Sequence, residues 1–162
     1  MRYLPGIDIE RDHYTIGTIC RNMKDGRIGY DRDGMEILLN DKALSKIIES
    51  IFIGIPLPSA YVNAMSEEFH WEFITGHTVL EALNRFVIKG DLVLDDLEIH
   101  TELNGMSFKD LHEYWQEEFL RVHWDLIIIS DREVSALSKE SKKRNNFLAR
   151  ENIYAIIKEF NG

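Results

Sequence analysis

The chain has 162 residues, of which 44% are hydrophobic and 29% are charged, a composition typical of a folded globular domain and not of a disordered chain. Its 28 Asp and Glu residues outnumber its 19 Lys and Arg residues, and the formal net charge of -9 disfavours broad contact with nucleic-acid phosphates or an anionic membrane surface. A single cysteine excludes an internal disulfide, and the longest apolar runs, at residues 51–57 and 126–129, are too short to span a bilayer.

The chain is predicted to form one domain over residues 1–162, because no repeat, low-complexity tract or linker interrupts it. Residues 1–10 lack the apolar segment and the cleavage pattern of a secretory signal, so we expect a cytoplasmic protein without membrane contact. Cys20 lies in an apolar stretch, where we expect a buried core thiol rather than a catalytic one.

Apolar residues at helical spacing predict helices over residues 16–23 and 44–51, with a short strand at residues 28–30 between them. The second helix has clear signals at both ends. These are Asn40 or Asp41 as the N-cap, and Gly54 followed by Pro56 as the stop.

A hairpin and a third helix are expected next. Residues 59–65 and 69–74 predict two strands that pair with each other. The turn at residues 75–78 leads into a helix that ends at Gly90. Thr78 and Glu81 have the spacing of a capping box, which predicts that this helix starts at Thr78.

The second half of the chain predicts helices around one buried strand. Capping-box spacing at Ser107 and at Ser130 predicts two helix starts, on either side of a buried-type strand at residues 124–129. Apolar spacing over residues 153–160 predicts the last helix. This alternation of strands and helices predicts a mixed α/β (α+β) domain, with the helices of residues 131–162 as part of it.

Four segments in a fixed order resemble one protein family. Residues 45–58 read SKIIESIFIGIPLP, residues 71–86 read WEFITGHTVLEALNRF, and residues 103–111 read LNGMSFKDL. The fourth segment is Tyr30-Asp31-Arg32, which stands where the family has an aromatic residue followed by Gln-Arg. Together these segments, which span about residues 16–130, resemble the N-terminal domain of GmrSD-type (type IV, modification-dependent) restriction enzymes.

The resemblance implies a ParB/sulfiredoxin-like fold, a small mixed sheet flanked by helices, whose signature loop contacts nucleotide phosphates. A glycine before a helix start suits this role, because it leaves unpaired backbone N–H groups facing an anion. Larger members of the family couple the use of a nucleoside triphosphate to DNA cleavage by a separate nuclease domain. No such domain is recognisable after Ser130.

The Asp-Gly-Gln-Gln-Arg signature of the family is altered in this chain. Its Asp corresponds to Thr75, its Gly to Gly76, its two Gln to His77 and Thr78, and its Arg to Val79. The chain therefore lacks the acid that would serve as metal ligand or base, and the Arg that would hold phosphate. Arg32 from the other motif remains as a matching phosphate anchor. The resemblance thus implies the candidate nucleotide-binding residues Arg32, Thr75, Gly76, His77 and Thr78.

Each candidate also has a structural interpretation. Residues 75–78 can be a plain strand-to-helix turn, and Arg32 can pair with Asp31, Asp33 or Glu36. The six His residues are scattered singly, without the spacing of a metal site. The basic residues of the segment 139–144 fit a solvated helix end better than a nucleic-acid contact.

Three functional hypotheses follow. In the first, the chain is a regulatory domain that binds a nucleoside triphosphate and hydrolyses it poorly or not at all. In the second, the nucleotide site is dead and the chain binds a protein, as an inhibitor or host-modulating factor of phage or mobile-element type would; its acidic surface suits a basic partner. The third is an active NTPase. No catalytic residue, metal ligand or direct nucleic-acid contact is predicted.

Overall fold

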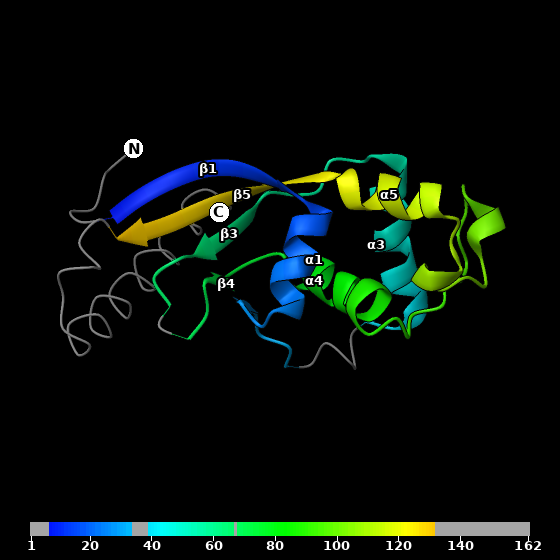
Figure 1. Ribbon diagram of the computed structural model, residues 1–162, viewed down its shortest axis with the longest axis horizontal. Helices are drawn as coiled ribbons and strands as arrows, with labels where there is room; N and C mark the ends of the chain where they lie inside the picture. Colours follow the sequence, from blue (N-terminus) through cyan, green and yellow to red (C-terminus); the bar gives the residue numbers. More distant parts are fainter. Residues whose placement is uncertain (1–6, 34–38, 67, 132–162) are drawn as a thin grey trace.

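A five-stranded mixed sheet and a group of helices make up the domain (Figure 1). The computed structural model describes residues 7–33, 39–66 and 68–131. These residues combine parallel and antiparallel strands with helices, which confirms the predicted mixed α/β class. In the order in which they lie in the sheet, the strands are β1 (Ile7–Thr15), β5 (His123–Asp131), β3 (Ala60–Asn63), β4 (Trp71–Phe73) and β2 (Ile28–Gly29).

Strand β5 joins the two parts of the sheet. It pairs antiparallel with β1 along its whole length, from Ile7 opposite Asp131 to Thr15 opposite His123, and parallel with β3. Strands β3 and β4 pair antiparallel, which confirms the predicted hairpin. Strand β2 pairs with β4 in parallel. The residues that follow β2 therefore start at the same edge of the sheet as the residues that follow β4.

The helices gather at one end of the sheet, on the right in Figure 1, while β1 and β5 extend to the left. Strand β1 continues directly into α1, and α5 leads directly into β5. The helical elements are α1 (Ile16–Lys24), α3 (Asp41–Ile53), α4 (His77–Leu83), the π-helix η1 (Asn84–Ile88), the 3-10 turns η2 (Thr101–Leu103) and η3 (Phe108–Asp110), and α5 (Glu113–Arg121).

One apolar core connects these helices with the sheet. Its members come from the apolar faces that the sequence spacing predicts, and each fully buried Leu, Ile or Phe contributes about 2 kcal/mol relative to exposure. Side chains less than 2% exposed include Ile16, Ile19, Leu44, Ile48, Leu80, Leu83, Phe86, Phe119 and Trp124. Cys20 belongs to the same core, where burial raises the pKa of its thiol to about 12. The expectation of a buried core thiol is therefore confirmed.

The ends of α3 follow the sequence signals closely. Asn40 is the N-cap, and its side-chain oxygen accepts a hydrogen bond from the Ala43 N–H at 2.9 Å. Gly54 ends the helix in the left-handed conformation at φ +84°, which glycine adopts without steric cost. Both predicted ends of this helix are confirmed.

Two capping predictions need correction. Helix α4 begins at His77, with Gly76 as N-cap and without a side-chain cap, so the predicted box of Thr78 and Glu81 is wrong. The carboxylate of Glu81 binds other groups, described below. The box of Ser107 and Asp110 is present, but it opens only the 3-10 turn η3, and α5 starts separately after His112.

Strand β1 has no counterpart among the predicted elements. Its residues are mostly polar, and it forms a strand because β5 supplies a full-length partner. The helix start predicted at Ser130 is wrong, because Ser130 and Asp131 continue strand β5 in its pairing with β1. The rest of the helices predicted after Ser130, and the basic segment 139–144, lie outside the described residues. In the part of the chain that the structure describes, no helix is long and apolar enough to cross a membrane.

A buried carboxylate fastens the loop after η1 to helix α3. The side chain of Glu49 on α3 is 7% exposed, and it accepts backbone N–H groups from Glu98 at 3.2 Å, Ile99 at 3.0 Å and His100 at 3.1 Å. Burial acts to raise the pKa of Glu49, but these three N–H donors outweigh it and hold the pKa below its ordinary value of 4.5.

We expect Glu49→Gln to lower the free energy of unfolding by about 2 kcal/mol at neutral pH, because a neutral amide accepts these N–H groups less strongly. Folding lowers the pKa of Glu49, so its contribution is complete above the unfolded value and is lost as pH falls through the lowered pKa. Urea unfolding of both proteins at about pH 7 and about pH 3 measures this. The difference between their free energies of unfolding should be smaller at the lower pH. An equal difference in free energy of unfolding at both pH values would contradict this role of the ionised Glu49.

Candidate functional site

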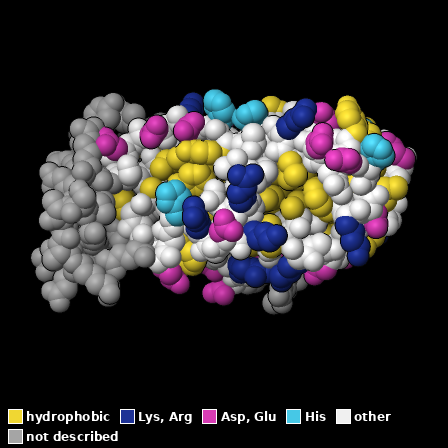
Figure 2. Space-filling model, in the orientation of Figure 1, with side chains coloured by type: hydrophobic (Ala, Val, Ile, Leu, Met, Phe, Trp, Pro, Cys, Tyr) yellow, Lys and Arg dark blue, Asp and Glu magenta, His cyan; other side chains and the backbone are white. Residues whose placement is uncertain are grey.

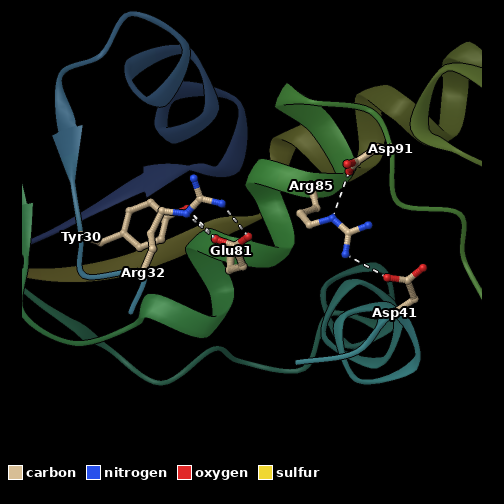
Figure 3. Close-up of polar contacts among 6 residues, drawn as sticks. All are labelled: Tyr30, Arg32, Asp41, Glu81, Arg85 and Asp91. Atoms are coloured by element: carbon tan, nitrogen blue, oxygen red, sulfur yellow. Dashed lines mark hydrogen bonds and ion pairs between the residues drawn. The ribbon is translucent and has the colours of Figure 1, made fainter. Parts of the chain in front are cut away.

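A buried carboxylate on α4 binds two residues that follow strand β2 (Figure 3). Glu81 is 3% exposed, and both of its oxygens are used. Oε1 accepts a hydrogen bond from Arg32 Nη2 at 3.0 Å, and Oε2 accepts from Arg32 Nε at 3.1 Å and from the Tyr30 hydroxyl at 2.9 Å. The Arg32 contact is therefore bidentate, which is the strongest geometry for a guanidinium and a carboxylate.

The electrostatics of this cluster are set by Glu81. A buried carboxylate is costly unless it is paired and hydrogen-bonded, and Arg32 with Tyr30 meets that need. Burial raises the pKa of the Tyr30 hydroxyl, and the hydrogen bond and charge of Glu81 raise it further, so Tyr30 stays a donor at neutral pH. The side chain of Arg32 is 43% exposed, so the pair connects the interior with the surface.

Three residues of the turn at 75–78 have contacts inside the domain. The Thr75 hydroxyl accepts the Tyr61 N–H at 2.9 Å, and a His77 ring nitrogen lies 3.0 Å from the carbonyl oxygen of Phe73. Gly76 has φ +84°, and a Cβ there would lie 2.8 Å from the Trp124 ring. Each of these three residues thus has a structural role that needs no ligand. This agrees with the interpretation of residues 75–78 as a plain strand-to-helix turn. Thr78 is exposed in the first turn of α4.

Arg32 contacts the helix that starts after Gly76. Its partner Glu81 lies five residues beyond Gly76, about one and a half turns along α4. The strand-turn-helix order around Gly76 is as predicted. The grouping of Arg32 with residues 75–78 in one site stays a prediction, because the described contact of Arg32 with this helix is at Glu81. The bond to Glu81 itself was missed, because the spacing of Glu81 from Thr78 suggested a cap instead.

A pocket of about 440 Å³ opens next to the cluster, between the start of α3 and the helix formed by α4 and η1. Three cationic side chains line it, and on the face shown in Figure 2 Lys and Arg side chains gather over α1 and α4. The lining residues are Arg32, Leu39, Asn40, Asp41, Leu44, Glu81, Arg85, Lys89 and Asp91. We call this the cationic pocket.

Arg85 is held in the cationic pocket by two carboxylates (Figure 3). Its Nη1 lies 2.8 Å from Asp41 Oδ1 and its Nε lies 3.0 Å from Asp91 Oδ1. Burial acts to lower the pKa of Arg85, but the two carboxylates outweigh it and raise the pKa above its ordinary value. The guanidinium is thus charged and fixed in direction.

The cations Arg85 and Lys89 come from a π-helical turn. In η1 the Lys89 N–H bonds to the carbonyl of Asn84, five residues back, at 2.7 Å. Single π-turns within α-helices are frequent at functional sites, because they re-aim side chains at a cost in hydrogen-bond geometry. The spacing of four between Arg85 and Lys89 was the available sequence signal for this pair.

A second pocket, of about 310 Å³, lies by the start of α4, next to the ends of strands β2 and β4. Its lining is acidic and aromatic, with Asp31, Glu68 and Glu72 beside Tyr30, Phe69 and His77. Gly29 is required here, because the Phe69 ring lies directly against its backbone where a Cβ would be. The lining suits a cation better than a phosphate. Among the described residues, no group of three or more His, Cys, Asp or Glu side chains is placed to hold a metal ion.

Comparison of the chain with protein-family models, with curated proteins and with solved structures finds no match. The resemblance to GmrSD-type N-terminal domains therefore stays a prediction from the sequence segments quoted above. The function is argued below from the geometry of the cationic pocket and its surroundings.

We expect Arg32→Ala to lower the free energy of unfolding by about 2–3 kcal/mol, because it leaves the Glu81 carboxylate buried without its countercharge. The double variant Arg32→Ala with Glu81→Leu should regain most of the loss, since no buried charge remains. Chemical denaturation of the three proteins measures this.

Lys46→Ala is the matched control. Lys46 and Glu98 form an exposed ion pair at 3.5 Å, which contributes less than about 1 kcal/mol. If Arg32→Ala lowers the free energy of unfolding no more than Lys46→Ala does, then the buried charge of Glu81 does not need Arg32 as its partner.

Proposed function

We propose that the domain binds the phosphate groups of a nucleoside triphosphate in the cationic pocket and acts as a regulatory domain without efficient hydrolysis. The observation that carries this proposal is the convergence of Arg32, Arg85 and Lys89 on one pocket of a chain whose net charge is -9. The lining holds three cations and three carboxylates, so it is formally neutral on a strongly acidic chain, and an anion meets less repulsion there than the net charge implies.

The pocket offers each kind of group that phosphate recognition uses. Guanidinium groups present planar pairs of donors to phosphate oxygens, and the Lys89 ammonium adds a mobile point charge. Asn40 and Asp41 bring the N-terminus of the 13-residue helix α3 to the same pocket. Helix starts favour anions through their unpaired N–H groups.

Carboxylates prepare the two arginines for binding. Glu81 fixes Arg32, while Asp41 and Asp91 fix Arg85, so little side-chain entropy is lost when a phosphate arrives. The same three carboxylates balance the formal charge of the three cations in the lining. We therefore expect a modest affinity, one that responds to cellular nucleotide levels.

The resemblance supports this proposal and changes its details. Arg32 is the residue that corresponds to the family's Gln-Arg motif, and it lines the cationic pocket. Thr75, Gly76, His77 and Thr78 do not line it, so the proposed phosphate position lies farther along the helix than the signature implies. A nucleotide ligand also accords with the cytoplasmic location predicted from the sequence.

Poor hydrolysis is proposed because the carboxylates near the pocket already have partners. Thr75 replaces the signature acid, and its hydroxyl accepts the Tyr61 N–H. Asp41, Glu81 and Asp91 are each bound to a guanidinium. A carboxylate in such a pair is a weak base, because its negative charge is already stabilised.

The alternative is a protein-binding domain with a dead nucleotide site. It is favoured by the pairing of Arg32 and Arg85 with carboxylates, which leaves less charge for a phosphate. The nucleotide experiment below separates the two functions.

We expect a nucleoside triphosphate with magnesium to raise the melting temperature. Ligand at about 100 times its dissociation constant adds about 2.7 kcal/mol to stability, which a thermal-shift assay detects. The assay compares ATP, GTP, CTP, UTP and inorganic tripolyphosphate. Lys89→Glu should abolish the shift, because it places a negative charge in the cationic pocket.

Lys24→Glu is the matched control. Lys24 is exposed in the last turn of α1, so the substitution changes the net charge equally outside the cationic pocket and should keep the shift. A flat response to every ligand at millimolar concentration would end the nucleotide proposal and leave the protein-binding function.

We expect turnover of each triphosphate well below about 1 per second, the low end for ordinary enzymes. Phosphate release with magnesium measures this, and Lys89→Glu protein from the same preparation reveals any contaminating NTPase. Turnover at or above that rate, lost in Lys89→Glu, would instead assign the third hypothesis, an active NTPase.

A further inference from the structure

An apolar surface lies at the far end of α3, away from the cationic pocket. Four of its side chains are large, hydrophobic and exposed, by 37% for Ile53, 51% for Ile55, 63% for Ile99 and 58% for Tyr114. Ile53 ends α3, Ile55 follows its C-cap, Ile99 lies in the loop after η1, and Tyr114 lies in the first turn of α5. We call these four residues the apolar end.

Aromatic contacts connect the three segments of the apolar end. Trp115 lies 5.9 Å from Phe52, 5.4 Å from His100 and 5.8 Å from Tyr114, measured between ring centroids. Phe52 precedes Ile53 in the chain, and His100 follows Ile99. The ring contacts therefore hold together the three segments that carry the exposed side chains.

The apolar end is also held in a defined shape. Glu49 binds the backbone N–H groups of residues 98–100, which fixes Ile99 relative to α3. A surface that is already ordered loses little entropy when a partner binds. Clusters of exposed apolar residues on a fixed backbone commonly mark interaction sites.

The segments that carry Ile99 and Tyr114 are mainly acidic. Residues 95–121 hold eight Asp and Glu residues against two cations, Lys109 and Arg121. Glu98 and Glu102, on either side of Ile99 and His100, have side chains 74% and 60% exposed, and Lys46 of α3 forms an exposed ion pair with Glu98 at 3.5 Å. Figure 2 shows hydrophobic side chains beside Asp and Glu at the end of the domain that carries α5. A partner must therefore combine apolar and basic groups.

We propose that the apolar end docks a basic amphipathic segment of a partner protein. Apolar side chains of that segment pack on Ile99, Tyr114 and the end of α3, and its Lys or Arg side chains face the surrounding carboxylates. Pairing with a second copy would place acidic rims against each other, which like-charge repulsion opposes. This docking is independent of nucleotide binding, because it uses none of the residues of the cationic pocket.

The test uses three synthetic peptides of equal length. The first has a Leu face and a Lys face at helical spacing, the second has the same composition in scrambled order, and the third has Glu in place of Lys. Fluorescence anisotropy should show binding of the first peptide alone, weakening as salt increases. Equal binding of the scrambled peptide would reduce the interaction to bulk charge and overturn the proposal, as would binding of the Glu peptide.

Substitutions locate the binding surface. The double variant Ile99→Ser with Tyr114→Ala should weaken binding of the first peptide at least about tenfold. Val93→Ser is the matched control and should leave binding unchanged. Val93 is 46% exposed, but it lies in the part of the loop that runs beside the first half of α3, where the Asp95 N–H bonds to the Ser45 hydroxyl.

Circular dichroism checks that both variants fold, which we expect because the substituted side chains are exposed. Equal weakening in Val93→Ser, or none in the double variant, would overturn the docking site. Sedimentation of the protein alone tests whether a second copy of the chain occupies the apolar end instead. A dimer that the double variant dissociates would assign the apolar end to a second copy and refute the proposal.

Discussion

The carboxylate of Glu81 lies inside the domain, and the structure around it is arranged to compensate its charge. Helix α4 turns almost every side toward the core, since Val79, Leu80, Ala82 and Leu83 are all buried as well. Glu81 is therefore only 3% exposed, and Arg32 and Tyr30 supply its hydrogen bonds. That bond fixes the segment after β2 against α4 and so places Arg32 at the edge of the cationic pocket.

Much of the fold could be predicted from local sequence patterns, because many of its elements carry their own signals. Helix α3 has an apolar face, an N-cap and a glycine stop, and the hairpin of β3 and β4 has two short apolar strands. Strand β1 could not be predicted in this way. Its partner β5 lies more than a hundred residues away, and pairing with that buried strand, not the polar sequence of β1, makes it a strand.

The candidate site was harder to predict, since its contacts join residues distant in the chain. Arg32 was selected through a family resemblance, but its partner Glu81 lies 49 residues later. Thr78 and Glu81 have the right spacing for a cap, yet the helix begins earlier, at His77, and the Glu81 carboxylate binds Tyr30 and Arg32 instead. The π-turn that brings Arg85 and Lys89 to the pocket leaves no mark in a pattern of period 3.6.

The loop after η1 connects the two proposed binding regions, and its attachments decide whether they communicate. At its start, Asp91 binds Arg85 in the cationic pocket. Farther along, the Asp95 N–H bonds to Ser45, and residues 98–100 bind Glu49. A phosphate that draws Arg85 away from Asp91 releases only the first of these attachments. The attachments to Ser45 and Glu49, both on α3, remain, so the apolar end stays fixed. Coupling between two sites requires an element with two arrangements that both ligands bias, and a loop held at two points to α3 does not provide one. The geometry therefore favours a domain in which a nucleotide and a protein partner bind without altering each other's affinity.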